Sequence, residues 1–287
     1  MSDNLLGIIE EKLPEMSKGQ RRIAEFITEH YDKAAFMTAS KLGAITGVSE
    51  STVVRFAAEL GFKGYPEMQK ALQEMVRTKL TSVQRLEVTN DRLGGEQDAV
   101  FTVLSGDVTA IRMTGEALDR AEVAASVDAL LRARTIYIVG VRSSAALAAY
   151  LNFYFRNIFP NVRMITSTAT SEMLEELLRV GPEDVVIGIS LPRYSSRTVK
   201  LMQYAHERGA TVVVITDKPG APAGKVANHV LCATSNMISV VDSLVAPMSV
   251  INALIVSVCL RPEIHAEKTF EELERLWDEY DAFERVE

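Results

Sequence analysis

Three neighbouring side chains, Ser51, Thr52 and Arg55, combine short hydroxyl donors with a guanidinium group. Groups of this kind donate hydrogen bonds to DNA phosphates and to base edges in a major groove. On a helix, Ser51 and Arg55 would lie one turn apart on the same face. The chemistry that these residues favour is therefore contact with double-stranded DNA, provided that the chain folds so as to present them to solvent.

The spacing of residues 37–62 fits two short helices that cross over a tight turn. Leu42 and Ile45 supply apolar contacts for the first helix. Gly43 offers a surface without a side chain, where the second helix can approach closely, and Gly47 suits the turn. The stretch therefore predicts a helix-turn-helix, although two helices with a glycine turn also occur in helical domains that touch no nucleic acid.

The second helix has clear ends and one apolar stripe. Ser49 is a good N-cap residue, and Gly61 suits the position after the last turn. Apolar residues recur between them at i, i+3, i+4 and i+7, namely Val53, Phe56, Ala57 and Leu60. The candidate DNA contacts are the polar residues left for solvent and a nearby lysine suited to a phosphate: Ser49, Ser51, Thr52, Arg55 and Lys63.

The residues before this pair also favour helices. Ser17 followed by Gln20 is a capping-box pattern, and it opens a helix whose apolar face holds Ile23, Ala24, Ile27 and Tyr31. The first domain is therefore predicted to be all-helical. The whole chain has a formal net charge of -7, so DNA affinity would have to come from a few placed side chains and from doubling the domain in a dimer.

The composition is that of a folded chain with two domains. Of the 287 residues, 47% are apolar, which is enough for one small and one medium domain. Cys232 and Cys259 lie inside apolar runs, so we expect reduced core thiols. No metal-ligand spacing appears in the sequence, and we expect neither a metal site nor a cofactor.

Two features bear on location. No charged and apolar leader opens the chain, and together with the reduced thiols this favours the cytoplasm. Residues 244–260 are apolar for most of their length, but they include Pro247 and Asn252 and are slightly short for a membrane span. We expect a helix buried between a sheet and a partner subunit, and no membrane partner.

The second half of the chain alternates short β-branched runs with helical segments. The runs are residues 135–140, 162–166, 184–190, 211–216 and 229–233. They lack apolar-polar alternation, as strands buried on both faces should, and they predict a parallel sheet flanked by helices. The predicted organisation is an all-helical domain at 1–77, a linker and connecting helix at 78–118, and an α/β domain at 119–287.

Hydroxyl side chains follow three of these runs. In a parallel sheet of this type, ligands bind beyond the carboxyl ends of the strands. Hydroxyls and free N–H groups at helix starts suit a phosphate there, while simple helix capping is the alternative. The clusters that predict a site for a phosphorylated small molecule are Ser143 and Ser144; Thr166, Ser167 and Thr168; and Ser190, Ser195, Ser196 and Thr198.

Four stretches, taken in order, resemble a known family. They are GVSESTVVRFAAELGFKGYPE, VGVRSSAALA, ISLPRYSSRTV and ITDKPGAPAGKVANHVL. Over nearly its whole length the chain resembles the RpiR/MurR family of bacterial transcription regulators. The resemblance implies a helix-turn-helix DNA-binding domain followed by a sugar isomerase (SIS) domain that senses a phosphosugar. It also implies a homodimer or homotetramer.

The resemblance also places two ligand loops. The Gly-x-Gly-x-Ser loop of SIS domains falls on Gly140, Arg142 and Ser144, and the Ser-x-Ser-Gly-x-Thr loop falls near Ser190, Ser195 and Thr198. Both loops depart from the family pattern. Arg142 stands at a glycine position, and Pro192-Arg193-Tyr194 replaces the glycine-bearing stretch.

Arginine can bind phosphate or carboxylate through two parallel hydrogen bonds. We hypothesise that Arg142 and Arg193 help to hold an acidic, phosphorylated sugar; internal ion pairs or contacts with a partner subunit are the other roles open to them. The candidate effector-binding residues are Gly140, Arg142, Ser143, Ser144, Ser190, Arg193, Ser195 and Thr198.

An enzymatic role is less favoured. An isomerase needs a general base beside the substrate carbon. The four histidines are poorly placed for this role, and Glu172, Glu175 and Glu176 fit a solvated helix start equally well. We therefore expect no catalytic residues and a DNA-binding regulator that is not an enzyme. The alternatives are a sugar-phosphate isomerase and an SIS assembly module without a ligand.

Overall fold

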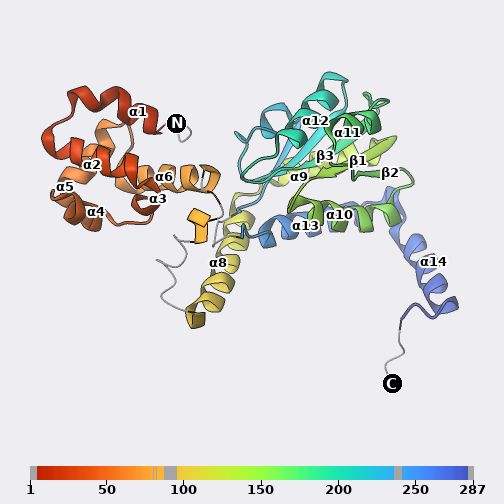
Figure 1. The fold of residues 1–287 in the computed structure, drawn as a ribbon. Coiled ribbons are helices and arrows are strands. Elements are labelled where there is room, and N and C mark those ends of the chain that lie inside the picture. Colours follow the sequence, from red (N-terminus) through yellow and green to blue (C-terminus); the bar gives the residue numbers. More distant parts are fainter. Residues whose placement is uncertain (1–4, 80, 82, 87–95, 236–240, 284–287) are drawn as a thin grey trace. The chain divides into compact units, whose positions relative to one another are not determined.

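The computed structural model describes residues 1–287 except 1–4, 80, 82, 87–95, 236–240 and 284–287. The chain forms two compact units, whose boundary lies between Thr102 and Val103, inside helix α8 (Glu96–Ala117). The first unit is helical and the second is built on a sheet (Figure 1), so the predicted fold class is confirmed. Residues 80, 82 and 87–95 of the predicted linker and connecting helix lie outside the described residues, and the domain limits at 77 and 118 stay a prediction.

The first unit is a bundle of short helices. It contains α1 (Leu5–Lys12), α2 (Lys18–Glu29), α3 (Tyr31–Ala34), α4 (Ala39–Thr46), α5 (Glu50–Glu59) and α6 (Tyr65–Lys79). Helix α2 begins with the predicted capping box, in which the Ser17 hydroxyl accepts from the Gln20 N–H and the Gln20 side chain accepts from the Ser17 N–H. Apolar side chains of these helices, among them Ile23, Leu42 and Phe56, form one core.

Helices α4 and α5 form the predicted helix-turn-helix. Gly47 ends α4 in the left-handed region with a φ of 66°, and Ser49 Oγ caps α5 by accepting from the Thr52 N–H at 3.3 Å. A Cβ atom on Gly43 would lie 2.8 Å from the Val48 carbonyl oxygen. The close approach predicted at Gly43 is therefore confirmed, and it sets the angle at which α5 leaves the turn.

The apolar stripe of α5 is confirmed, but one contact predicted for α4 is wrong. The stripe residues Val53, Phe56, Ala57 and Leu60 are all buried. Ile45, by contrast, is 49% exposed. The reason is geometric: the buried stripe of α4 runs along Ala39, Leu42, Gly43 and Thr46, and Ile45 lies to one side of it.

Helix α6 fastens the loop in front of α4. Tyr65 Oη and Gln69 Nε2 donate to the Met37 carbonyl oxygen at 2.7 and 2.6 Å, and Gln73 Nε2 donates to the Ala35 carbonyl oxygen at 3.0 Å. The Tyr65 side chain is buried, and desolvation raises the pKa of its phenol from 10.0 to about 12. The place where α4 begins is thus fixed by α6.

Within the described residues, the second unit holds a parallel sheet of five strands in the order β2-β1-β3-β4-β5. The parallel direction confirms the sequence prediction. The order of neighbours was not predicted. The strands are β1 (Thr135–Gly140), β2 (Val162–Ile165), β3 (Asp184–Ile189), β4 (Thr211–Thr216) and β5 (His229–Cys232).

Helices cover both faces of the sheet (Figure 1). Helices α9 (Arg120–Arg132), α10 (Ser144–Ile158) and α13 (Val245–Cys259) share one core with Ile136 and Ile138, while α11 (Thr170–Glu176) and α12 (Ser196–Glu207) share the other core with Tyr137 and Val139. Helix α14 (Ala266–Glu279) follows α13. In the part of the chain that the structure describes, α13 included, no helix is both long enough and apolar enough to span a membrane.

The two cysteines lie less deeply than predicted. Cys232 and Cys259 are free thiols, and each is half-buried because Cys232 ends the edge strand β5 and Cys259 ends α13. Desolvation raises the pKa of both thiols, and at Cys232 the nearby Asp217 and Glu122 raise it further. Neither environment favours a reactive thiolate.

Gly43→Ala tests the close approach at the helix pair. The added methyl group would press on the Val48 carbonyl oxygen and should lower the free energy of unfolding of the first unit by about 1 to 3 kcal/mol. Gly115→Ala is the matched control, because Gly115 lies in α8 with nothing within 4 Å of its Cβ position. It should raise stability by about 0.5 to 1 kcal/mol. Urea unfolding measures both, and a gain from Gly43→Ala would contradict the close approach.

Candidate functional site

The solvent side of α5 carries the polar residues that the sequence singled out. Ser51 and Arg55 are exposed, and Arg55 Nε donates to the Ser51 carbonyl oxygen at 3.3 Å, which holds the side chain along its own helix. The Ser49 hydroxyl is engaged in capping and lies 2.9 Å from Ser51 Oγ and 2.8 Å from Thr52 Oγ1. The outer hydroxyls and the end of the Arg55 guanidinium are therefore the groups best placed to meet a ligand.

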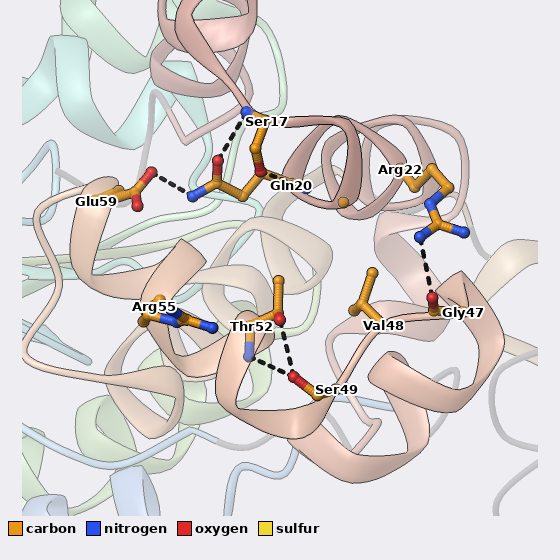
Figure 2. A pocket seen from close by; sticks show the side chains of 10 residues that line it. Ser17, Gln20, Arg22, Gly47, Val48, Ser49, Thr52, Arg55 and Glu59 are labelled. Carbon is orange, nitrogen blue, oxygen red and sulfur yellow. Dashed lines mark hydrogen bonds between the residues drawn. The ribbon is translucent and has the colours of Figure 1, made fainter.

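A hollow of about 510 Å³ lies beside these groups, between the start of α2 and the helix pair. Figure 2 shows Arg22 reaching from α2 to the turn, where its Nη2 donates to the Gly47 carbonyl oxygen at 3.0 Å. At the other end of the view, Gln20 Nε2 donates to Glu59 Oε2. The lining residues are Ser17, Gly19, Gln20, Arg22, Gly47, Val48, Ser49, Thr52, Arg55 and Glu59.

The structure brings together part of the predicted DNA-contact set. Ser49, Thr52 and Arg55 line the hollow, and Ser51 adjoins them on α5. Lys63 is exposed between α5 and α6 and does not line it; its backbone N–H donates to Glu67 Oε2 at 2.6 Å. Sequence analysis missed Arg22, because nothing in the spacing links α2 to a turn that lies 25 residues later.

The effector residues predicted in the second unit lie on two loops that leave neighbouring strands. Gly140 at the end of β1 is in register with Ile189 at the end of β3. The chain then runs to α10 on one face of the sheet and to α12 on the other. In sheets with this strand order, the point where consecutive connections diverge leaves a crevice that binds ligands. We call these two loops, residues 140–144 and 190–198, the rim.

Gly140 is required by the geometry of the rim. A Cβ atom there would lie 2.5 Å from the Ser144 carbonyl oxygen, so α10 starts closer to β1 than any side chain would allow. The first turn of α10 therefore presses against the strand end. This is the close approach for which a glycine is used at ligand loops.

Arg142 and Arg193 both adopt left-handed backbone, with φ values of 58° and 62°. Glycine adopts this conformation freely, whereas another residue loses about 1 to 2 kcal/mol in it. The two loops thus keep a backbone shape suited to glycine while presenting arginine side chains, and both arginines are exposed. Strain held at paired positions on one ligand rim points to a function for the side chains.

The serines of the rim do not act as helix caps. Ser143 and Ser195 occupy the N-cap positions of α10 and α12, yet neither side chain accepts a capping hydrogen bond. Ser190 Oγ and Thr198 Oγ1 are buried and have no hydrogen-bond partner among the described residues. Ser144 is also buried. Side-chain caps do occur elsewhere, on α2, α4, α5 and α9, from Ser17, Thr38, Ser49 and Asp119, whereas α3, α11, α13 and α14 have none.

The loop after β3 is held in place by β4. Tyr194 Oη donates to Asp217 Oδ1 at 2.7 Å, and Thr216 Oγ1 donates to the Ser190 carbonyl oxygen at 2.6 Å. These bonds flank Arg193 and hold its backbone in the left-handed conformation. The Tyr194 side chain therefore positions the loop, which sequence analysis did not anticipate.

In the hydroxyl cluster after β2, Ser167 is satisfied locally. Ser167 Oγ contacts Glu172 Oε2 and accepts from the Ala169 N–H at 3.2 Å, so this loop after β2 closes on itself. Its residues are not on the rim as defined above. Glu172 was one of the acidic side chains considered above as a general base. Its contact with Ser167 holds it to the loop after β2, the strand that pairs with β1.

An ion pair with a buried carboxylate lies at the amino ends of β1 and β3, the ends opposite the rim. Arg134 Nη2 and Nε donate to the buried Asp184 carboxylate at 2.6 and 3.1 Å, and this hydrogen bonding raises the pKa of Arg134. His229, at the start of β5, lies 3.1 Å from Glu122. Among the described residues, no cluster of three side chains is arranged to hold a metal ion.

Two family models match the chain. The model described as helix-turn-helix domain, rpiR family, matches residues 3–79, and the model described as SIS domain matches residues 129–257. The HTH-type transcriptional regulator HexR of Pseudomonas aeruginosa is 28% identical over 225 residues, which span 77% of this chain and 76% of HexR.

Solved structures share the fold. The sugar isomerase domain of an RpiR transcription factor from Sphaerobacter thermophilus superposes with a TM-score of 0.58 and 27% identity, covering 61% of this chain and 97% of that one. The NanR protein of Vibrio vulnificus, complexed with ManNAc-6P, superposes with a TM-score of 0.58 and 22% identity, covering 96% of this chain and 99% of that one.

Arg193→Gly tests the strain at the rim. Glycine removes the backbone strain of the left-handed conformation, which stabilises the folded chain. It also increases the conformational entropy of the unfolded chain, which offsets part of this gain. The free energy of unfolding should therefore rise by up to about 1 kcal/mol. Arg112→Gly, at an exposed site within α8, is the matched control. It should lower the free energy of unfolding by about 1 kcal/mol, because glycine is unfavourable inside a helix. Chemical unfolding of the second unit measures both. Equal losses for the two variants would show that Arg193 is unstrained.

Proposed function

The chain belongs to the RpiR family of helix-turn-helix transcriptional regulators with a SIS domain, and on that premise we propose that it binds operator DNA and adjusts this binding to a phosphorylated or acidic sugar. The observation that carries the proposal is the α5 surface. One side of this helix is buried in the bundle, which leaves Ser51 and Arg55 facing solvent on a rigid support.

The DNA-binding step uses α5 as the groove-reading helix. Ser51, Thr52 and Arg55 would contact base edges or phosphates, with Lys63 on the adjacent backbone. The net charge of -7 gives no general attraction to DNA, so two copies of the unit must act together. A regulator that binds operator DNA works in the cytoplasm, which is the location that we propose.

The sensing step uses the rim of the second unit. Ser190 and Thr198 carry buried hydroxyls without a hydrogen-bond partner among the described residues, and Arg142 and Arg193 present exposed guanidinium groups. Donors of both kinds suit an anionic ligand. NanR, which has the same fold, is complexed with ManNAc-6P. We therefore infer a ligand of that chemical class, a sugar that carries phosphate or carboxylate.

We propose that two copies of the chain pair through the outer face of α10 and α13. Phe153 and Val256 are 62 and 56% exposed there, and Leu260, directly after α13, is 77% exposed. On the opposite face, α11 and α12 expose no large apolar side chain within their bounds, although Leu178, just after α11, is 62% exposed. A face of this kind is typical of a subunit interface. The partner is a second copy of the chain, in a homodimer or homotetramer; a monomer in analytical ultracentrifugation would contradict this.

Effector and operator are linked through the dimer. Two groove-reading helices must lie about 34 Å apart to match half-sites one duplex turn apart. An effector that prefers one arrangement of the SIS dimer changes this separation. A coupling of about 1 to 3 kcal/mol would alter operator affinity by roughly 5- to 150-fold, which is sufficient for regulation.

An isomerase is the second candidate, and Glu172 is the observation in its favour, because its carboxylate contacts Ser167 in the loop after β2, the strand that pairs with β1. The curated relatives named above are regulators, and we propose that the chain is a sensor without catalytic residues. Turnover of an aldose or ketose phosphate that Glu172→Gln abolishes would establish the enzyme instead.

Arg55→Ala tests the DNA interface. A genomic fragment selected with the purified protein provides the operator, and fluorescence anisotropy measures affinity. The substitution should weaken operator binding by about 1 to 3 kcal/mol if Arg55 makes a bidentate base contact. Lys200→Ala, at an exposed site of the second unit outside the rim, is the control and should leave affinity unchanged. An equal loss on all DNA sequences would make Arg55 a phosphate contact, and no loss would remove it from the interface.

A thermal-shift screen against phosphorylated and carboxylated sugars tests the sensing step. A ligand of the rim should raise the unfolding temperature of the second unit. Calorimetry on the double variant Arg142→Gly and Arg193→Gly should then show an affinity loss of about tenfold or more for each charged hydrogen bond removed. Arg112→Gly serves as the control. Unchanged affinity in the double variant would show that the two arginines do not bind the ligand. If no compound in the screen raises the unfolding temperature, the SIS assembly module without a ligand is favoured.

A further inference from the structure

The hollow of the first unit contains two guanidinium groups that come from different helices. Arg22 belongs to α2 and Arg55 to α5, and both line the same hollow. Their hydrogen bonds go to neutral carbonyl oxygens, those of Gly47 and Ser51. Among the described residues, neither guanidinium has a carboxylate within ion-pair distance. The positive charge of both side chains is therefore available to an anion.

The acidic residue of the hollow does not cancel this charge. Glu59 lies at the end away from Arg22 (Figure 2), and its carboxylate accepts from Gln20 Nε2. The Arg22 end is bordered instead by Gly47, Val48 and Ser49. The first turn of α5, which contributes Thr52, adds partial positive charge there. Arg22 therefore lies at the turn, away from the acidic residue, whereas Arg55 lies on the same side of the hollow as Glu59 (Figure 2).

The arrangement also fixes where an anion would lie relative to DNA. The helix pair reads a major groove with α5, and the phosphates that border this groove run past the elements beside α5. The hollow directly adjoins α5 through Ser49, Thr52 and Arg55. A phosphate within reach of Arg22 is therefore a backbone phosphate next to the bases that α5 contacts.

We propose that the hollow receives one phosphate of the DNA backbone and that Arg22 binds it. The bond from Arg22 Nη2 to the Gly47 carbonyl oxygen holds the planar guanidinium in place before DNA arrives, and the remaining N–H groups can donate to two phosphate oxygens in parallel. This inference rests on the proposed function, since it needs α5 to read DNA. It adds a contact from α2 that carries no sequence information.

Salt-dependent DNA binding by Arg22→Gln in the full-length chain tests the inference. The glutamine amide can still donate to the Gly47 carbonyl oxygen, but it carries no charge. Affinity should fall several-fold on operator and unrelated DNA alike. The slope of log affinity against log salt should shrink by about 0.9 for each DNA-bound unit.

Two further variants separate charge from structure. Arg21→Gln is the matched control, because Arg21 is exposed on the same helix and does not line the hollow; it should leave the slope unchanged. Arg22→Lys keeps the charge and should keep the slope. If the role of Arg22 is only structural, affinity will follow the unfolding temperature of each variant and the slope will not change.

The outcomes distinguish this inference from the proposed function. If the wild-type chain binds no selected DNA fragment, the proposed function as a DNA-binding regulator is wrong. A wild-type chain that binds DNA, with the same salt slope in Arg22→Gln, overturns only the phosphate contact. If Arg22→Gln lowers affinity for one operator sequence only, Arg22 contacts bases, and the proposed phosphate contact is also wrong.

Discussion

The hydrogen bonds between β1 and β3 bring Gly140 level with Ile189, and the second unit depends on this alignment more than on any other contact. Beyond these residues the chain diverges, to α10 on one face and to α12 on the other. Their first turns consequently lie at the same end of the sheet, which is where sheets of this strand order bind ligands. A slip of one residue in this register would exchange the side chains of the two faces and disrupt both cores.

The hydroxyl groups of the chain fall into two kinds. Those that begin helices away from the rim, such as Ser17 and Ser49, are satisfied by the backbone that they cap. Those at the rim, such as Ser190 and Thr198, are buried without a partner among the described residues. Buried polar groups without partners are uncommon in folded proteins and lower stability. Their position on the rim is an observation in favour of the proposed effector site.

Local patterns in the sequence were sufficient to predict the main elements. The β-branched runs predicted the strands, and capping residues such as Ser17 and Ser49 predicted where helices begin, because both signals act over a few residues. The stripe of α5 followed from the same periodicity. Ile45 was misplaced because a short helix offers too few positions to define the centre of its buried face.

Long-range features could not be predicted in the same way. The strand order depends on which β-branched runs become neighbours, and these runs are too alike to specify it. The bond from Arg22 to Gly47 joins helices that are separated by another helix. The left-handed arginines were also hidden, because residue type argues against that conformation and only the surrounding bonds, such as that of Tyr194 to Asp217, maintain it.

The tyrosine that fastens α6 to the loop before α4 has a consequence in alkaline solution. Below pH 10, the Tyr65 phenol is neutral in both the folded and the unfolded chain, and its bond to Met37 contributes fully. Between about pH 10 and 12 only the unfolded chain ionises, because the folded pKa is the higher one. Stability is therefore lost as alkalinity increases through this interval, and the helix pair loosens at the point where α6 supports it.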